Sequence, residues 1–300
     1  MQLGKHWLMM SLFAIIAVTG PVQATDRTNV SRIVSIGGSV TEIIYMLGAS
    51  DKIVAVDTTS VFPAEALQTK ASVGYMRQIS PEGVLSILPD LVLTVEDAGP
   101  PQALEVLRES GIAFETVANP PTTDGVLAKI RHIGNLLGEQ GRANAEITRI
   151  ETDLARLKTA QGAIRKTKKV LFLLTAASDR MVAGGTGTTA AGIIELAGGE
   201  NAIADFAGYK PVSAEAVLAM KPDAILIMKR GDHAAEPSDI SGNPVFAELP
   251  ATINNDIFAM DGTLLLGFGP RVVDAAWMLT EWLYPYLGPK NPASEQAAAE

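Results

Sequence analysis

The feature that most constrains the fold of this chain is an internal repeat. Residues 79–93 (ISPEGVLSILPDLVL) align without a gap with residues 212–226 (VSAEAVLAMKPDAIL), and seven of the fifteen positions are identical. The identical pairs are Ser80/Ser213, Glu82/Glu215, Val84/Val217, Leu85/Leu218, Pro89/Pro222, Asp90/Asp223 and Leu93/Leu226. Because the same unit stands once in each half of the chain, we expect two similar lobes.

Each copy of the repeat predicts a helix, a short turn and a strand. Its serine is the expected N-cap, and the glutamate two residues later falls in the first helical turn, where a carboxylate suits the helix dipole. The shared proline ends the helix, and the apolar runs at 91–95 and 224–228 predict buried strands. A Gly-Tyr pair precedes each copy, at 74–75 and 208–209. Two lobes with a tyrosine at matched places favour a cleft with a ligand between them.

Composition limits the class of protein. The 300 residues suit two domains better than one, and 47% hydrophobic with 19% charged residues is typical of a soluble globular chain. A net charge of -9 argues against nucleic acid or an anionic membrane surface as the main partner. The chain has no cysteine, which excludes disulfides, thiolate metal sites and cysteine nucleophiles.

The first 24 residues predict a secretory signal peptide. Lys5 and His6 precede an apolar run at 7–18, and Ala24 closes a Val-Gln-Ala sequence with small residues where signal peptidase cleaves. The apolar run is short for a membrane span, although an uncleaved anchor is the alternative. We therefore expect an exported, soluble mature protein that begins at Thr25, without membrane insertion.

Strands and helices alternate along the rest of the chain. This alternation predicts an α/β fold with two Rossmann-like lobes and mostly parallel sheets. The expected strands are 32–36, 53–56, 91–95, 114–117, 170–174, 224–228 and 257–260, and further helices are expected at 41–47, 102–110, 190–196 and 272–283, the last after a loop at 264–271.

A long helical region separates the two halves. Apolar residues recur at spacings of three and four from 125 to 160, and Gly138 and Gly141 divide this region into two segments. The second segment is expected to be a long linker helix that holds the lobes at a fairly fixed angle. The expected organisation is a signal peptide at 1–24, an N-terminal lobe at 25–121, a linker region at 122–165, a C-terminal lobe at 166–286 and a flexible tail at 287–300.

Two familiar chemistries find little support. The glycine-rich stretch at 184–189 (GGTGTT) lacks the Gly-Lys-Ser/Thr ending of a phosphate-binding loop, so a turn is the better interpretation. Of the three histidines, His6 is lost with the signal peptide, His132 lies within a predicted helix and His233 lies in a predicted loop. Neither a histidine-rich zinc site nor a Ser-His-Asp triad is expected from such a set.

Tyr75 and Arg77 form a more informative pair. They lie in the link to a helix start, where loop residues often meet ligands. A phenolate binds ferric iron, and a nearby guanidinium favours that deprotonated form. The alternative from chemistry alone is a partly buried packing tyrosine. Glu82 and Glu215 likewise have two interpretations. A carboxylate in the first helical turn is common because it interacts favourably with the helix dipole. An acidic side chain at the same point of each lobe would also fit a partner with two basic pockets.

Several stretches together resemble the periplasmic substrate-binding proteins of iron-complex and cobalamin ABC importers, most closely the haem-binding branch. The resemblance covers nearly the whole mature chain and is carried by 32–48 (RIVSIGGSVTEIIYMLG), 73–93 (VGYMRQISPEGVLSILPDLVL), 208–226 (GYKPVSAEAVLAMKPDAIL) and 260–271 (MDGTLLLGFGPR). It implies the class III binding-protein fold, in which one long helix joins two lobes. It also implies a monomeric periplasmic carrier of haem b of the Gram-negative type, not an enzyme.

The same resemblance assigns roles to individual residues. Tyr75 matches the tyrosine that ligates haem iron, and Arg77 matches the arginine that hydrogen-bonds its oxygen. Glu82 and Glu215 match the carboxylates that dock onto arginine pockets of the ABC permease, which works with its ATPase. Some relatives add a histidine from the second lobe, but here residues 175–183 contain none. Ligation by a single tyrosine is therefore expected.

Further cleft residues are predicted with alternatives. Met181, Tyr209 and His233 are candidate neighbours of the ligand, and Arg230 and Arg271 are candidate partners of the haem propionates or else solvated surface charges. A ferric siderophore or cobalamin carrier is the alternative within the same class of proteins. An exported hydrolase is the alternative from another class, but the sequence supplies no catalytic base with an orienting partner.

Overall fold

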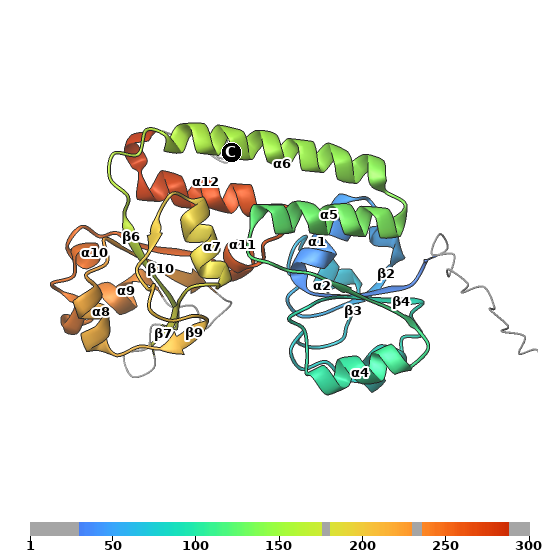
Figure 1. Cartoon of the computed structure of the whole chain (residues 1–300). Coiled ribbons are helices and arrows are strands. Elements are labelled where there is room, and N and C mark those ends of the chain that lie inside the picture. The colour runs from blue at the N-terminus through green and yellow to red at the C-terminus, as the bar shows by residue number, and fades with distance from the viewer. Residues whose placement is uncertain (1–29, 176–180, 230–235, 288–300) are drawn as a thin grey trace, which may run out of the picture.

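The computed structural model describes residues 30–175, 181–229 and 236–287, which form two α/β lobes (Figure 1). The first lobe contains a five-stranded sheet in the order β3-β2-β1-β4-β5, and every neighbouring pair is parallel. Its strands are β1 (Ile33–Ile36), β2 (Ile53–Val56), β3 (Ala71–Ser72), β4 (Leu91–Val95) and β5 (Ala113–Val117). The parallel α/β sheet expected for this lobe is confirmed.

The second lobe contains a mixed sheet. Its strands are β6 (Lys169–Thr175), β7 (Val182–Gly184), β8 (Glu200–Asn201), β9 (Tyr209–Pro211), β10 (Ala224–Lys229) and β11 (Ile257–Asp261). They follow the order β11-β10-β6-β7-β9, with β8 beside β6, and β7 runs antiparallel to both of its neighbours. The other pairs of this sheet, β10 with β11, β10 with β6 and β6 with β8, are parallel, so the expected α/β fold with mostly parallel sheets is confirmed.

The repeat folds as predicted at its start. The helices are α3 (Pro81–Leu85) and α8 (Ala214–Met220), and the hydroxyls of Ser80 and Ser213 each accept a hydrogen bond of 3.2 Å from the backbone N–H three residues later. Both helices end before the shared proline rather than at it. The residue just before each proline, Leu88 or Lys221, adopts the left-handed conformation, with φ of 53° and 47°.

The Pro-Asp pair of each repeat ties two central strands together. The carboxylate of Asp90 accepts hydrogen bonds from the backbone N–H groups of Ser31 (2.9 Å) and Arg32 (3.0 Å), and that of Asp223 accepts one from Lys169 (2.9 Å). Each aspartate also donates its own N–H to the carbonyl of the same arginine or lysine. The repeat thus joins β1 to β4 in one lobe and β6 to β10 in the other.

Two consecutive helices connect the lobes. The hydroxyl of Thr122 caps α5 (Thr123–Leu137), which ends at Gly138 with φ of 76°, and α6 (Gln140–Gln161) follows. The predicted division into two helical segments is confirmed at Gly138, whereas Gly141 lies inside α6 and does not break it. The 22 residues of α6 span about 33 Å at 1.5 Å per residue. Figure 1 shows α6 lying across both lobes above α12 (Val272–Leu283), which packs against it.

Some of the remaining helices were predicted from the sequence and others were not. The structure contains α1 (Gly38–Met46), α2 (Glu65–Thr69), α4 (Pro101–Glu109), α7 (Thr189–Leu196), α9 (Pro237–Ser241), α10 (Pro250–Ile253) and α11 (Gly262–Leu266). The loop expected at 264–271 is wrong at its start, because Asp261 accepts hydrogen bonds from the N–H groups of Thr263 (3.0 Å) and Leu264 (2.9 Å) and so caps α11.

Among the described residues, no helix is long and apolar enough to cross a membrane.

The aspartate of the first repeat is expected to stabilise the whole lobe. Replacing it in Asp90→Ala leaves two backbone N–H groups and the hydroxyl of Ser31 without their acceptor. The free energy of unfolding should fall by about 1–3 kcal/mol, measured by urea denaturation. Glu105→Ala on the exposed side of α4 is the matched control. Equal stability of the two variants would contradict the strand tie.

Candidate ligand-binding site

The loops at the carboxyl edge of the first sheet bring Tyr75 next to the loop after β2. Val73 donates its backbone N–H to the carbonyl of Val56 and Thr58 donates to that of Gly74, both at 2.9 Å. Open α/β sheets bind ligands at this edge of their strands. The tyrosine of the first Gly-Tyr pair therefore lies where a ligand is expected.

A buried aspartate holds this edge in shape. One carboxylate oxygen of Asp57 accepts from the N–H of Gly37 (2.8 Å), and the other accepts from the N–H (2.8 Å) and hydroxyl (2.7 Å) of Thr59. Asp57 is fully buried, so these bonds replace those that it would make with water. Sequence reasoning missed this residue, although an Asp-Thr-Thr-Ser run directly after a strand was the available signal.

The two residues of the predicted iron site differ in exposure. Tyr75 is half-buried, packs against the core of the first lobe and follows Gly74, whose φ is 86°. Arg77 is exposed and makes an ion pair of 3.5 Å with Asp97. An exposed pair of this kind contributes little to stability, so the guanidinium can change partners at small cost.

Arg271 makes an ion pair that joins the two halves of the molecule. Its Nε and Nη2 donate to the two carboxylate oxygens of Glu42 on α1, at 2.9 and 3.0 Å. Its guanidinium carbon also lies 3.6 Å from the centre of the Phe62 ring. Glu42 is buried and Arg271 is mostly so, which makes this a planar, bidentate pair of the stronger kind. A propionate at Arg271 would have to share the guanidinium with Glu42.

Lys129 makes a second contact between the halves. Its ammonium donates to the hydroxyl of Ser39 (3.2 Å), to the carbonyl of Phe268 (3.1 Å) and to the side-chain oxygen of Asn119. Burial lowers the pKa of Lys129 to about 8, and nearby carboxylates, Asp97 foremost, offset part of this effect. The loop before α12 is thus fixed to α1 by two cations.

The second lobe presents Tyr209 at the first position of the edge strand β9. Its ring meets that of Phe172 edge-on with centroids 6.2 Å apart, and its hydroxyl lies 2.9 Å from that of Thr189. The side chain is 38% exposed. Gly208 has φ of 78°, so the Gly-Tyr pair has a similar left-handed glycine in both lobes.

The other predicted cleft residues are less favourably placed. Met181 is only 3% exposed and packs in the core of the second lobe. Arg230 and His233 lie outside the described residues.

Glu82 and Glu215 occupy matched, exposed positions. Each lies in the first turn of its helix, and its pKa is lowered by its own backbone N–H and by the hydroxyl of Ser80 or Ser213. Both carboxylates are therefore ionised at neutral pH. Because each helix ends beside the amino end of the following strand, its first turn lies toward the carboxyl edge of the sheet.

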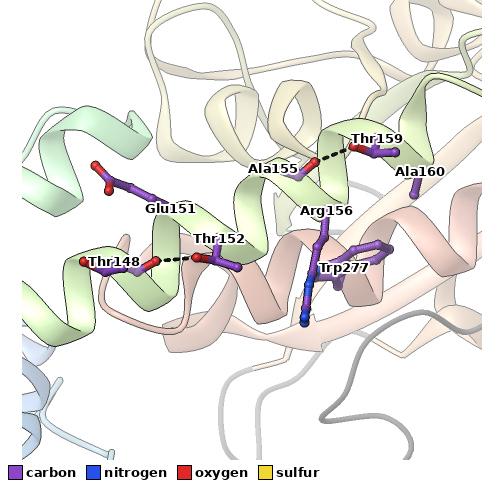
Figure 2. A pocket seen from close by; sticks show the side chains of 8 residues that line it. All are labelled: Thr148, Glu151, Thr152, Ala155, Arg156, Thr159, Ala160 and Trp277. Carbon is purple, nitrogen blue, oxygen red and sulfur yellow. Dashed lines mark hydrogen bonds between the residues drawn. The ribbon is translucent and has the colours of Figure 1, made fainter.

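A separate hollow of about 780 Å³ runs along α6 (Figure 2). It is lined by threonines, Glu151, Arg156 and the edge of Trp277. The hydroxyls of Thr152 and Thr159 donate to carbonyls of their own helix, as Figure 2 shows, and so are already bonded. We assign no ligand to this hollow.

Among the described residues no group of three or more acidic or histidine side chains could hold a metal ion.

Comparison with known proteins finds a matching family and similar solved structures. A family model described as "Periplasmic binding protein" matches residues 33–264. The fold is similar to that of the periplasmic heme-binding protein RhuT from Roseiflexus sp. RS-1, with a TM-score of 0.80 and 35% identity over 86% of this chain and 99% of that one.

Two further similarities bear on the ligand. The periplasmic heme-binding protein BhuT, in complex with two hemes, has a TM-score of 0.80 and 32% identity over 86% of this chain and 99% of its own. A vitamin B12-binding protein of Pectobacterium carotovorum is 27% identical over 78% of this chain and 84% of its own length.

The buried lysine should give stability a measurable pH dependence. Its folded pKa is about 8, whereas an unfolded lysine titrates near its usual 10.5, so the unfolded state binds more protons between these values. The free energy of unfolding should therefore rise with pH in this window. Between about pH 7 and about pH 9.5 it should rise by about 2 kcal/mol more in the wild type than in Lys129→Met, measured by urea denaturation.

The control for this prediction is Lys158→Met, which removes an exposed lysine of α6. This variant should keep the pH dependence of the wild type. If Lys129→Met also keeps it, the buried ammonium does not titrate in this window.

Proposed function

This chain belongs to the periplasmic binding protein family. One relative, 27% identical over 87% of this chain, is named as an ABC transporter substrate-binding lipoprotein of Bacillus subtilis. We propose that this chain captures ferric haem and delivers it to an ABC permease. The observation that carries the proposal is the position of Tyr75, two residues before Arg77, at the carboxyl edge of a parallel sheet. A phenolate oxygen is a good ligand for ferric iron, and a neighbouring guanidinium favours the phenolate by its charge.

Haem fits the residues around Tyr75 in two respects. The loop after β2 carries exposed apolar side chains, Val61 (40%) and Phe62 (43%), that could cover a porphyrin face. Arg77 lies two residues beyond the tyrosine and is held only by an exposed ion pair. The protein would supply binding without a catalytic step. Apolar burial gives affinity, and the bond from Tyr75 to iron selects the metal complex.

The haem propionates require cations or hydrogen-bond donors. We propose Arg230 and Arg271 for this role, with Arg271 shared between Glu42 and the ligand. We further propose that the cleft lies between an N-terminal lobe at 25–121 and a C-terminal lobe at 166–286, joined by the linker at 122–165. Residues 1–24 would direct the chain to a Gram-negative periplasm.

Cobalamin is the second candidate ligand. It is favoured by the similarity to proteins named for vitamin B12 binding, at 27% identity. The identity to heme-binding structures is higher, at 32–35%, and haem accounts better for a Tyr-x-Arg sequence at the carboxyl edge.

We propose that Glu82 and Glu215 dock the carrier onto the permease. Both are exposed and ionised, and they stand at equivalent points of the two lobes. A permease with an arginine pocket for each lobe would recognise this pair of carboxylates.

Removing the Tyr75 hydroxyl should change the iron site. We expect purified wild-type protein to give a saturable Soret band on titration with hemin, with charge-transfer bands typical of a tyrosinate ligand. Tyr75→Phe should lose those bands and bind hemin at least about tenfold more weakly, because the iron bond is absent. Tyr45→Phe, which changes a tyrosine on α1 remote from this edge, is the matched control.

Cyanocobalamin titrated in parallel separates the two candidates. A wild-type protein that binds cyanocobalamin and gives no saturable hemin spectrum would overturn the haem proposal. A Tyr75→Phe variant with the wild-type spectrum would leave haem as the ligand and remove Tyr75 as its axial residue.

Docking should be separable from binding. Glu82→Gln and Glu215→Gln remove one charge each and leave the side-chain shape, so the hemin spectrum and affinity should not change. Uptake of haem, or hemin-stimulated ATPase activity of the reconstituted importer, should fall by about tenfold for either variant. Glu105→Gln on α4 should have no effect. A changed hemin spectrum in the docking variants would contradict their assigned role.

A further inference from the structure

The Gly-Tyr pairs of the two lobes share a backbone device. Gly74 and Gly208 have φ of 86° and 78°, and a Cβ built on either would meet nothing within 4 Å. Glycine is needed there for its left-handed conformation and not for space. The same device therefore sets the position of Tyr75 in the first lobe and of Tyr209 in the second.

The surroundings of Tyr209 differ from those of Tyr75. Its hydroxyl pairs with that of Thr189 at 2.9 Å, and either oxygen can be the donor. Each hydroxyl carries one O–H, so a single bond between them leaves one O–H to donate elsewhere. Within the described residues, neither hydroxyl has a second hydrogen-bond partner.

The hydroxyl pair lies on the side of the second lobe that meets the first. Thr189 opens α7, and a Cβ at Gly192 of the same helix would lie 2.5 Å from the carbonyl oxygen of Pro121, so α7 touches the segment that leaves the first lobe. Figure 1 shows α7 on that side. The Tyr209 ring packs edge-on against Phe172, a fully buried residue. The pair is thus partly exposed and stands at the start of the helix that touches this segment.

We propose that the Tyr209–Thr189 hydroxyl pair donates a hydrogen bond to a carboxylate of the ligand. The inference rests on the proposed function, in which that carboxylate is a haem propionate. A hydroxyl pair with one uncommitted O–H needs an acceptor, and a carboxylate oxygen is the strongest neutral-pH acceptor that haem offers. Because Arg271 shares its guanidinium with Glu42, a neutral donor in the second lobe would add to the hold on a carboxylate.

The test compares hemin with hemin dimethyl ester, in which both propionates are capped. Tyr209→Phe and Thr189→Val should each weaken hemin binding about tenfold and leave ester binding within about twofold of the wild type. The absorption spectrum of bound hemin should not change, because the iron ligand is intact. Circular dichroism melting curves confirm that each variant is folded.

Lys210→Gln is the matched control. Lys210 follows Tyr209 in β9, so its side chain points to the other face of the sheet, where its ammonium lies 5.3 Å from the centre of the Phe206 ring. This variant removes a full charge and should still bind hemin as the wild type does.

Three results would overturn the inference. Equal weakening for hemin and its ester would mean that the pair does not contact a carboxylate. A shifted Soret or charge-transfer band in Tyr209→Phe would mean that Tyr209 acts at the iron. Unchanged hemin affinity in both variants would remove the pair from the site. If wild-type protein binds no hemin, the proposed function itself fails, and this result is separate from any result with the variants.

Discussion

The carboxylates of Asp90 and Asp223 are the contacts on which the rest of this architecture depends. Each accepts hydrogen bonds from the backbone of the first strand in its sheet and starts the neighbouring strand. The bonds fix the amino ends of the central strands, and the preceding helices α3 and α8 therefore begin toward the opposite edge. Glu82 and Glu215, in the first turns of these helices, therefore stand at matched places in the two lobes.

Two largely buried cationic side chains join the halves of the molecule, and their burial has an energetic consequence. Lys129 and Arg271 hold the loop before α12 against α1, with Glu42 as the carboxylate between them. Buried charges cost desolvation energy, and the lowered pKa of Lys129 expresses that cost. Hydrophobic packing would serve stability equally well, but a bidentate ion pair accepts one geometry only. Together with the continuous α6, this contact favours a fixed angle between the lobes over a hinge.

The sequence predicted those parts of the fold that local chemistry determines. The N-caps at Ser80 and Ser213, the division of the linker at Gly138 and the central strands all follow from nearby residues. The antiparallel β7 and β9 could not be predicted in this way, because three-residue strands have too little periodicity. The same holds for the Glu42–Arg271 pair, whose members are 229 positions apart. Asp57 was missed for a similar reason, since its partners Gly37 and Thr59 come together only in the folded sheet edge.

The two lobes are alike in backbone but not in chemistry, and that difference bears on what they can bind. A left-handed glycine precedes a tyrosine in each, yet the first tyrosine is followed by a cationic Arg77 and the second is paired with a neutral hydroxyl on Thr189. One scaffold repeated twice therefore presents two tyrosines with different polar neighbours. The ligand proposed above is asymmetric in a similar way, since the iron and the carboxylates of haem lie at different places on one flat molecule.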